Sequence, residues 1–170
     1  SQFTETSALL GNDLATFPDF PAEIRAPLGT VAGVSGFQVH IGNTEINTPG
    51  DVADVLVAMN PAALKANKNW IKKGGTIIIN SDSFAKKDLD KAGYENNPLE
   101  DGSFSGFNIV EAPIANLTQE TLKDSGLDGK SIRRAKNMFA LGMVYWMFNR
   151  PMERTKKFLK DKFESKPLVV

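Results

Sequence analysis

Two apolar runs separated by an amphipathic stretch form the clearest pattern in this sequence. Residues 52–59 are almost continuously apolar, as in a strand covered on both faces, and residues 76–80 form a second such run. Between them, Asn60 is placed to cap a helix that begins at Pro61, has Lys72 and Lys73 in its last turn and ends at Gly74. This order predicts a βαβ unit in which strands 54–59 and 76–80 are adjacent and parallel.

The rest of the pattern predicts a mixed α/β chain. Alternating positions at 33–41 predict a half-buried strand, and Gly42-Asn43 predicts a turn into 44–46, so a hairpin is expected near residues 33–46. Three prolines within residues 17–27 favour an ordered loop or edge strand. A short strand is expected at 107–110, and helices at 2–14, 84–92, 117–122, 131–149 (with Ser131 as a cap) and 152–163. The expected fold class is a three-layer, mostly parallel sheet flanked by helices.

Residues 138–148 are apolar around the whole predicted helix, so we expect them to be mostly buried, partly by another chain or domain. This stretch of 11 residues is too short to span a bilayer, and no membrane association is expected. No secretory leader is visible, which favours the cytoplasm. The sequence begins without Met, and we expect a chain that is trimmed or only partly represented.

Composition narrows the possible functions. A chain of 170 residues with 41% hydrophobic and 24% charged residues is expected to fold as one globular domain. It contains no cysteine and one histidine, so it cannot supply thiolate ligands to an iron–sulfur cluster or build a multi-histidine metal site. No metal site is expected, and the catalytic residues stay unknown.

Charge is unevenly distributed along a chain whose net charge is zero. Residues 1–122 carry 8 Lys and Arg against 15 Asp and Glu, whereas residues 123–166 carry 12 against 5. The basic residues alternate with acidic ones along predicted helices, so a solvated face or a subunit contact is favoured over nucleic-acid binding.

Two segments are candidates for ligand binding. The carboxyl ends of the predicted parallel strands are followed by Asn60 and by Asn80-Ser81-Asp82, and a helix beginning at Asn60 would favour a phosphate. Each of these residues can also serve only as a cap or a turn. The second segment contains Gly29, Thr30, Ser35 and Gly36, whose small side chains let a ligand approach the backbone.

Arg25 precedes that glycine-rich segment and adds a charged group that can bind phosphate or carboxylate. Glycines beside a strand can instead mark a bulge, and Arg25 can pair with Glu23. His40 is expected on the polar side of a strand as a surface residue, and Asp51 and Asp54 at the opposite end from the ligand edge. Neither a dinucleotide fingerprint nor a Walker lysine motif occurs in the sequence.

The block from Phe17 to Gln38, with Glu23-Ile-Arg-Ala-Pro-Leu-Gly-Thr30 at its centre, resembles a segment of the 2-oxoacid:acceptor (ferredoxin) oxidoreductases. It is similar to the version in the alpha subunit of 2-oxoglutarate:ferredoxin oxidoreductase, where a gamma-type domain comes first. The resemblance continues through Asp54-Val-Leu-Val-Ala-Met-Asn60, Lys73-Gly-Gly-Thr-Ile-Ile-Ile-Asn80 and Ala135-Lys-Asn-Met-Phe-Ala-Leu-Gly142. It implies that residues 1–170 form a single gamma-type domain. The family's N-terminal Gly-rich loop and its C-terminal catalytic domains are absent from this sequence.

The resemblance also implies an activity in the assembled enzyme. Such an enzyme decarboxylates a 2-oxoacid, here 2-oxoglutarate, to its acyl-CoA and reduces ferredoxin. Its cofactors are thiamine diphosphate, Mg, iron–sulfur clusters and coenzyme A, and none is assigned to this segment alone. The implied partners are a thiamine-binding beta subunit, the remaining alpha-subunit domains and ferredoxin. For this domain the implied role is packing and a contribution to the coenzyme A side of the active site, with Arg25, Gly29, Thr30, Ser35, Gly36 and Asn60 as candidate binding residues.

Two alternatives remain open at this point. One is a stand-alone nucleotide-binding α/β oxidoreductase domain, and the other is a non-enzymatic interaction module whose apolar helix docks a partner.

Overall fold

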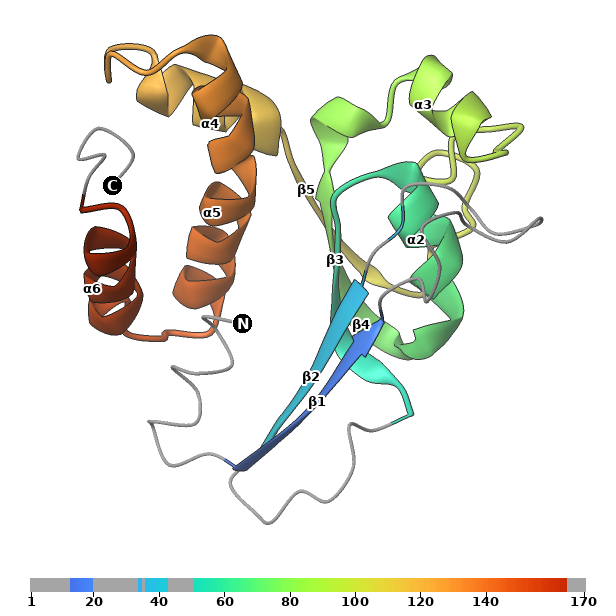
Figure 1. Cartoon of the computed structure of the whole chain (residues 1–170). Coiled ribbons are helices and arrows are strands. Elements are labelled where there is room, and N and C mark those ends of the chain that lie inside the picture. Colours follow the sequence, from blue (N-terminus) through green and yellow to red (C-terminus); the bar gives the residue numbers. More distant parts are fainter. Residues whose placement is uncertain (1–12, 20–33, 35, 43–50, 165–170) are drawn as a thin grey trace. The chain divides into compact units, whose positions relative to one another are not determined.

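The computed structural model describes residues 13–19, 34, 36–42 and 51–164 (Figure 1). The contacts divide the chain into two compact units. We call the described residues 51–113, which contain β3 to β5, the sheet unit, and the described residues 114–164, which contain α4 to α6, the helical unit.

The sheet unit is built on three parallel strands in the order β3-β4-β5. Strand β3 (Ala53–Ala58) pairs with β4 (Ile71–Asn80), with Val55 opposite Thr76 and Ala58 opposite Ile79. Strand β4 also pairs in parallel with β5 (Asn108–Ala112), with Thr76 opposite Asn108. The predicted adjacent parallel strands are therefore confirmed.

Helix α2 (Pro61–Asn67) is shorter than the sequence pattern predicted. A 3-10 turn, η1 (Lys68–Trp70), follows it, and Lys72 and Lys73 belong to β4 instead of the last helical turn. The Asn67 side chain donates to the carbonyl of Ala63 at 2.8 Å, a local bond of the kind that weakens helices. The predicted helix end at Gly74 is thus wrong, because Ile71 is already paired with Ala53 of β3.

A bulge explains why this stretch resembled a helix terminus. Between the pairs Ala53–Ile71 and Val55–Thr76, β3 advances two residues while β4 advances five. Gly74 lies among the additional residues of β4 and adopts a φ of +76°. This φ costs a residue with a side chain about 1–2 kcal/mol. The N–H of Gly74 donates to the carbonyl of Gly106 at 2.8 Å, and its carbonyl accepts from the Asn108 side chain at 2.9 Å. A Cβ on Gly75 would lie 3.0 Å from the carbonyl oxygen of Asp54.

The core of the sheet unit lies between β4 and its helices. Ile77 and Ile79 of β4 share one buried cluster with Leu64 of α2 and Leu89 of α3 (Lys86–Lys91). Ile78 alternates to the opposite face and is also buried, so both faces of the central strand are covered. The loop between α3 and β5 adds Phe104 to the core, with its ring centroid 5.7 Å from that of Phe107.

The helical unit contains α4 (Ile114–Leu122), α5 (Gly129–Met147) and α6 (Glu153–Lys162). Helix α5 is capped by Asp128, three residues before the predicted cap: its carboxylate accepts from the backbone N–H of Ser131 at 2.6 Å. This bond and the Ser131 hydroxyl lower the pKa of Asp128. Serine and aspartate are both favoured at the N-cap position, so the sequence alone could not distinguish Ser131 from Asp128 as the cap.

The end of α5 is a turn of the Schellman type. Asn149 adopts a φ of 49°, its N–H donates to the Trp146 carbonyl at 3.1 Å, and the N–H of Arg150 donates to the Tyr145 carbonyl at 2.8 Å. The chain then enters α6, which lies beside α5 (Figure 1). Within this chain Ala140 and Tyr145 are buried and Trp146 is 83% exposed, so the burial of residues 138–148 by another chain or domain stays a prediction.

A separate two-stranded sheet joins β1 (Asp13–Asp19) and β2 (Gly36–Gly42). The strand predicted at 33–41 is confirmed as β2, while residues 43–46 of the expected hairpin lie outside the described residues. The helix predicted over 2–14 is wrong for Asp13 and Leu14, which begin β1, and its other residues also lie outside the described part of the chain. The edge-strand interpretation of the proline-rich stretch holds for its described residues, 17–19.

Candidate active-site edge of the sheet

The carboxyl ends of β3 and β4 meet at one edge of the sheet, as the sequence predicted. Asn80 ends β4, and its side chain is completely buried. Its amide Nδ2 donates to the hydroxyl of Ser83 at 2.7 Å and contacts the carbonyl of Met59, after β3, at 3.5 Å. Asn80 therefore links the segments that follow the two strands.

The side-chain oxygen of Asn80, Oδ1, lacks a hydrogen-bond partner at this edge. It is buried and has no donor among the described residues. An unmatched buried acceptor costs about 1–3 kcal/mol of stability. The favourable contribution of Asn80 therefore comes from its amide nitrogen, which contacts Ser83 and Met59. The sequence predicted Asn80 at the carboxyl end of a strand, as a ligand contact or as a turn residue, and its burial was not expected. Only its position at the end of an apolar run could have indicated its burial.

Asn60 is confirmed as the cap of α2, with Oδ1 accepting from the Ala63 N–H at 2.8 Å. Pro61 has no N–H and the Ala63 N–H is engaged, so Ala62 provides the only donor among the first three helical positions that the cap leaves unused. The helix start can offer an anion little more than its dipole and the Asn60 amide. Binding by Asn60 stays a prediction.

The structure locates the other candidate residues only in part. Gly36 begins β2, and its backbone pairs within the two-stranded sheet. His40 lies on β2 and is exposed, as expected for a surface histidine. Arg25, Gly29, Thr30 and Ser35 lie outside the described residues, so their assignment as binding residues stays a prediction.

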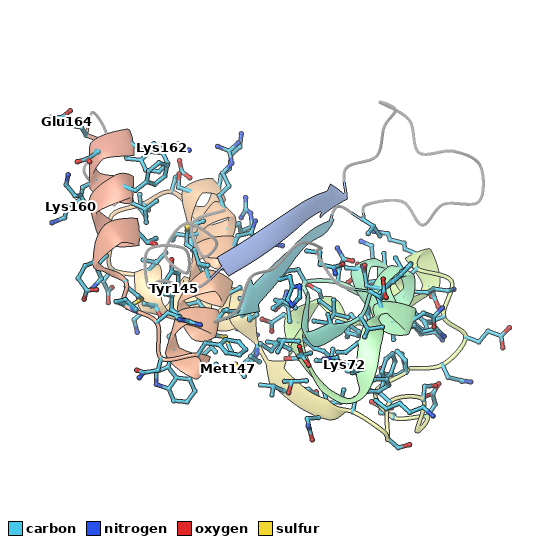
Figure 2. All side chains as sticks on the ribbon, turned by 90° about the horizontal axis from the view of Figure 1, so that it is seen from below. Lys72, Tyr145, Met147, Lys160, Lys162 and Glu164 are labelled. Atoms are coloured by element: carbon cyan, nitrogen blue, oxygen red, sulfur yellow. The ribbon has the colours of Figure 1, made fainter. Side chains whose placement is uncertain are left out.

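The amino end of the sheet carries an ion pair instead of an acid–base pair. The ammonium of Lys72 (Figure 2) lies 2.7 Å from the carboxylate of Asp54, and both side chains are more than half exposed. Exposed pairs of this kind contribute about 0–1 kcal/mol. Asp51 is exposed at the same end. Neither aspartate lies at the carboxyl edge, which agrees with the structural role expected from the sequence.

A shallow pocket of about 320 Å³ lies beside α3 and was not expected. It is lined by Phe84, Lys86, Leu89, Asp90, Tyr94, Glu95, Asn96 and Asn97. Burial, with a smaller contribution from the charge of Asp101, raises the pKa of Tyr94 to about 12, so its phenol stays neutral at physiological pH. The Tyr94 hydroxyl has no partner among the described residues.

Lys65 fixes the end of α3 next to this pocket. Its ammonium donates to the carbonyls of Ala92, at 3.0 Å, and Gly93, at 2.6 Å, and lies 5.1 Å from the centre of the Tyr94 ring. A cation at the last carbonyls of a helix complements its dipole. Lys65 therefore ties α2 to α3 and is engaged in structure.

The described part of the chain contains neither a cluster of metal-ligating side chains nor a helix that could span a membrane. Within residues 13–19, 34, 36–42 and 51–164, no group of three or more His, Asp or Glu side chains is arranged to hold a metal ion. In the same residues, no helix is long and apolar enough to cross a membrane.

Comparison with known proteins places this sheet and its flanking helices in a defined class. The family model for pyruvate ferredoxin/flavodoxin oxidoreductases matches residues 1–170. The chain is 51% identical over 168 residues to the 2-oxoglutarate oxidoreductase subunit KorA of Mycobacterium tuberculosis (strain ATCC 25618 / H37Rv), covering 99% of this chain and 26% of that protein.

A solved structure supports the same class. It is the 2-oxoglutarate:ferredoxin oxidoreductase from Magnetococcus marinus with 2-oxoglutarate, coenzyme A and succinyl-CoA bound. The match has a TM-score of 0.65 and 27% identity, and it covers 97% of this chain and 24% of that one. The chain thus spans about a quarter of the length of both relatives.

This chain belongs to the pyruvate ferredoxin/flavodoxin oxidoreductase family. The resemblance seen in the sequence is confirmed, and it favours neither the stand-alone nucleotide-binding domain nor the non-enzymatic module.

Proposed function

We propose that this chain is the gamma-type domain of a 2-oxoglutarate:ferredoxin oxidoreductase. The enzyme would release CO₂ from 2-oxoglutarate, transfer the succinyl group to the thiol of coenzyme A and pass the electron pair to ferredoxin. The observation that carries the proposal is the match of nearly the whole chain to a solved enzyme whose bound molecules are 2-oxoglutarate, coenzyme A and succinyl-CoA. The 51% identity to a subunit of a 2-oxoglutarate oxidoreductase supports the same substrate.

The chemistry of the complete enzyme would depend on groups held elsewhere. Thiamine diphosphate with Mg would supply the decarboxylation, and iron–sulfur clusters would carry the electrons. This chain has no cysteine with which to bind such a cluster. The partners we propose are a thiamine-binding beta subunit, the remaining alpha-subunit domains and ferredoxin, with the assembly in the cytoplasm.

We assign to this domain the coenzyme A side of the active site. The carboxyl edge of a parallel sheet is the usual position of a ligand, and here the Asn60 helix start lies at that edge beside the Met59–Asn80 contact. The Arg25 guanidinium can hold a phosphate through two parallel bonds, and the small residues Gly29, Thr30, Ser35 and Gly36 would allow a ligand close to the backbone.

The test is the substrate dependence of the purified natural complex. Reduction of ferredoxin is measured with 2-oxoglutarate, pyruvate or a branched 2-oxoacid, each with and without coenzyme A. We expect reduction with 2-oxoglutarate and coenzyme A together, with succinyl-CoA as the product identified by mass spectrometry. Preference for another 2-oxoacid would contradict the substrate, and NAD-dependent oxidation without ferredoxin would contradict the function.

A further inference from the structure

Three of the five exposed large apolar side chains of the helical unit lie at the end of α5 and in the turn that follows it. Trp146 is 83% exposed, Phe148 42% and Met152 39%, all within seven consecutive residues. An aromatic side chain of this size offers about 150–250 Å² of contact area, and most of that area of Trp146 is open to solvent. Large apolar side chains gathered on an exposed surface mark an interaction site.

The turn is ordered by its own hydrogen bonds. The N–H groups of Asn149 and Arg150 close the end of α5 on the carbonyls of Trp146 and Tyr145. The hydroxyl of Tyr145, a residue labelled in Figure 2, lies 2.6 Å from that of Thr155. Both residues are buried, and the contact joins α5 to α6. A surface held in place in this way loses little conformational entropy when it binds, which favours a specific contact.

Arg150 adds a positively charged side chain with an unmatched hydrogen-bond donor to this surface. Its Nε is buried and has no acceptor among the described residues, and Arg150 forms no ion pair with any of them. The two Nη groups of this guanidinium carry four further N–H donors, and a carboxylate supplied by a partner would bind them in charge-assisted bonds. Trp, Phe, Met and Arg together are the residue types enriched at the centres of protein interfaces.

The surrounding charge selects the kind of partner. Residues 123–166 carry 12 Lys and Arg against 5 Asp and Glu, and Lys156, Lys160 and Lys162 are exposed on α6. An acidic surface is therefore complementary. A symmetric contact with a second copy would bring two basic surfaces together, since the same patch meets itself across a two-fold axis.

We infer that the α5–α6 surface, formed by Trp146, Phe148, Arg150 and Met152, docks onto an acidic-rimmed apolar patch on the remainder of the same, longer polypeptide. The inference rests on the proposed function, in which this chain is one domain of a larger subunit. Matched regions of 26% and 24% leave about three quarters of each relative's polypeptide outside the part that corresponds to this chain. That remaining polypeptide would be linked to this domain in every copy of the enzyme, so its surface would always be available for the contact.

The decisive experiment places a photo-crosslinker, p-benzoylphenylalanine, at Trp146 in the natural, assembled enzyme. We expect crosslinks, mapped by mass spectrometry, to acidic segments of the same polypeptide outside residues 1–170. The matched control places the crosslinker at Phe158, which is 40% exposed on α6 but outside the turn, and should give at least fivefold less of that product. Crosslinks to a second copy or another subunit, yields equal to the control, or a natural polypeptide with no further domain would each overturn the inference.

A second variant tests the charge. Arg150→Glu should accelerate hydrogen–deuterium exchange in α5 and α6 of the assembled enzyme at least fivefold, whereas Lys160→Glu, the same charge reversal outside the turn, should not. Equal exchange in both variants would overturn the role of Arg150. Neither readout requires turnover, so a wrong substrate assignment under the proposed function would leave both results unchanged.

Discussion

The hydroxyl groups of Tyr145 on α5 and Thr155 on α6 lie 2.6 Å apart, and both residues are buried. Thr155 is the only residue of α6 whose exposed fraction falls below a tenth among those whose side chains are described. This hydrogen bond is therefore a buried polar link between the two helices.

Tyr145→Phe should lower the free energy of unfolding of the chain by about 1–3 kcal/mol, because the Thr155 hydroxyl loses its partner in a buried place. The double variant Tyr145→Phe/Thr155→Val should recover part of that loss, because the Thr155 hydroxyl is then no longer present to be left unmatched. Chemical denaturation of the three proteins measures both effects. Additive losses in the double variant would show that the two hydroxyls do not depend on each other.

Gly74 and Gly142 should respond in opposite directions to the same substitution. Gly74→Ala should destabilise the chain by about 1–2 kcal/mol, since alanine resists the φ of +76° in the bulge of β4. Gly142→Ala, inside α5 with no atom within 4 Å of the added Cβ, should stabilise it by about 0.5–1 kcal/mol. Thermal unfolding measures both changes, and a neutral Gly74→Ala variant would refute the role given to the bulge.

Asn60 has a structural role that can be separated from its proposed binding role. Asn60→Ala should cost about 1 kcal/mol of stability through loss of the α2 cap, whereas Asn60→Ser keeps a capping oxygen and should cost little. If the amide also contacts coenzyme A, Asn60→Ser should raise the KM for coenzyme A about 2–10-fold, the effect of one neutral hydrogen bond. A wild-type KM in the stable serine variant would leave Asn60 as a cap alone.

The pKa of Tyr94 predicts a dependence of stability on alkaline pH. The pKa is about 12 in the folded chain, against about 10 for an unperturbed tyrosine. Between these values the unfolded state loses its proton first, so the free energy of unfolding should fall as pH rises from 10 to 12 and should be unaffected by this group below pH 10.

Tyrosinate absorbance measures the pKa directly, because the chain has only two tyrosines. The difference between the titrations of the wild-type chain and of Tyr94→Phe should have its midpoint near pH 12. A midpoint near pH 10 would show that the Tyr94 phenol is not shielded from water.

Local signals predicted the βαβ unit, because the Asn60 cap, the Pro61 start and the two apolar runs each act over a few residues. The end of α2 was not predictable in the same way. Lys72, Lys73 and Gly74 satisfy the rules for a helix terminus, and only the pairing of Ile71 with Ala53, which depends on a distant strand, assigns them to β4.

The site was predictable only as an edge of the sheet. The sequence placed Asn60 and Asn80 at the carboxyl ends of the strands, and the structure confirms that position. It could not show that Asn80 is buried, because that depends on how the end of β4 packs beside Met59, after the neighbouring strand. Nor could it show that Tyr94 lines a pocket, because that depends on how residues 84–97 fold around α3.

The most direct test of the account is the KM for coenzyme A of Arg25→Ala in the natural, assembled enzyme, measured through ferredoxin reduction with saturating 2-oxoglutarate. Loss of a charge-assisted contact to phosphate should raise that KM about tenfold or more, with Arg25→Lys between the variant and the wild type. Glu23→Gln is the control for a purely structural pairing of Arg25 with Glu23, and unfolding temperatures of all variants exclude simple loss of folding. Normal kinetics for coenzyme A in Arg25→Ala would contradict the assignment of this domain to the coenzyme A side of the active site.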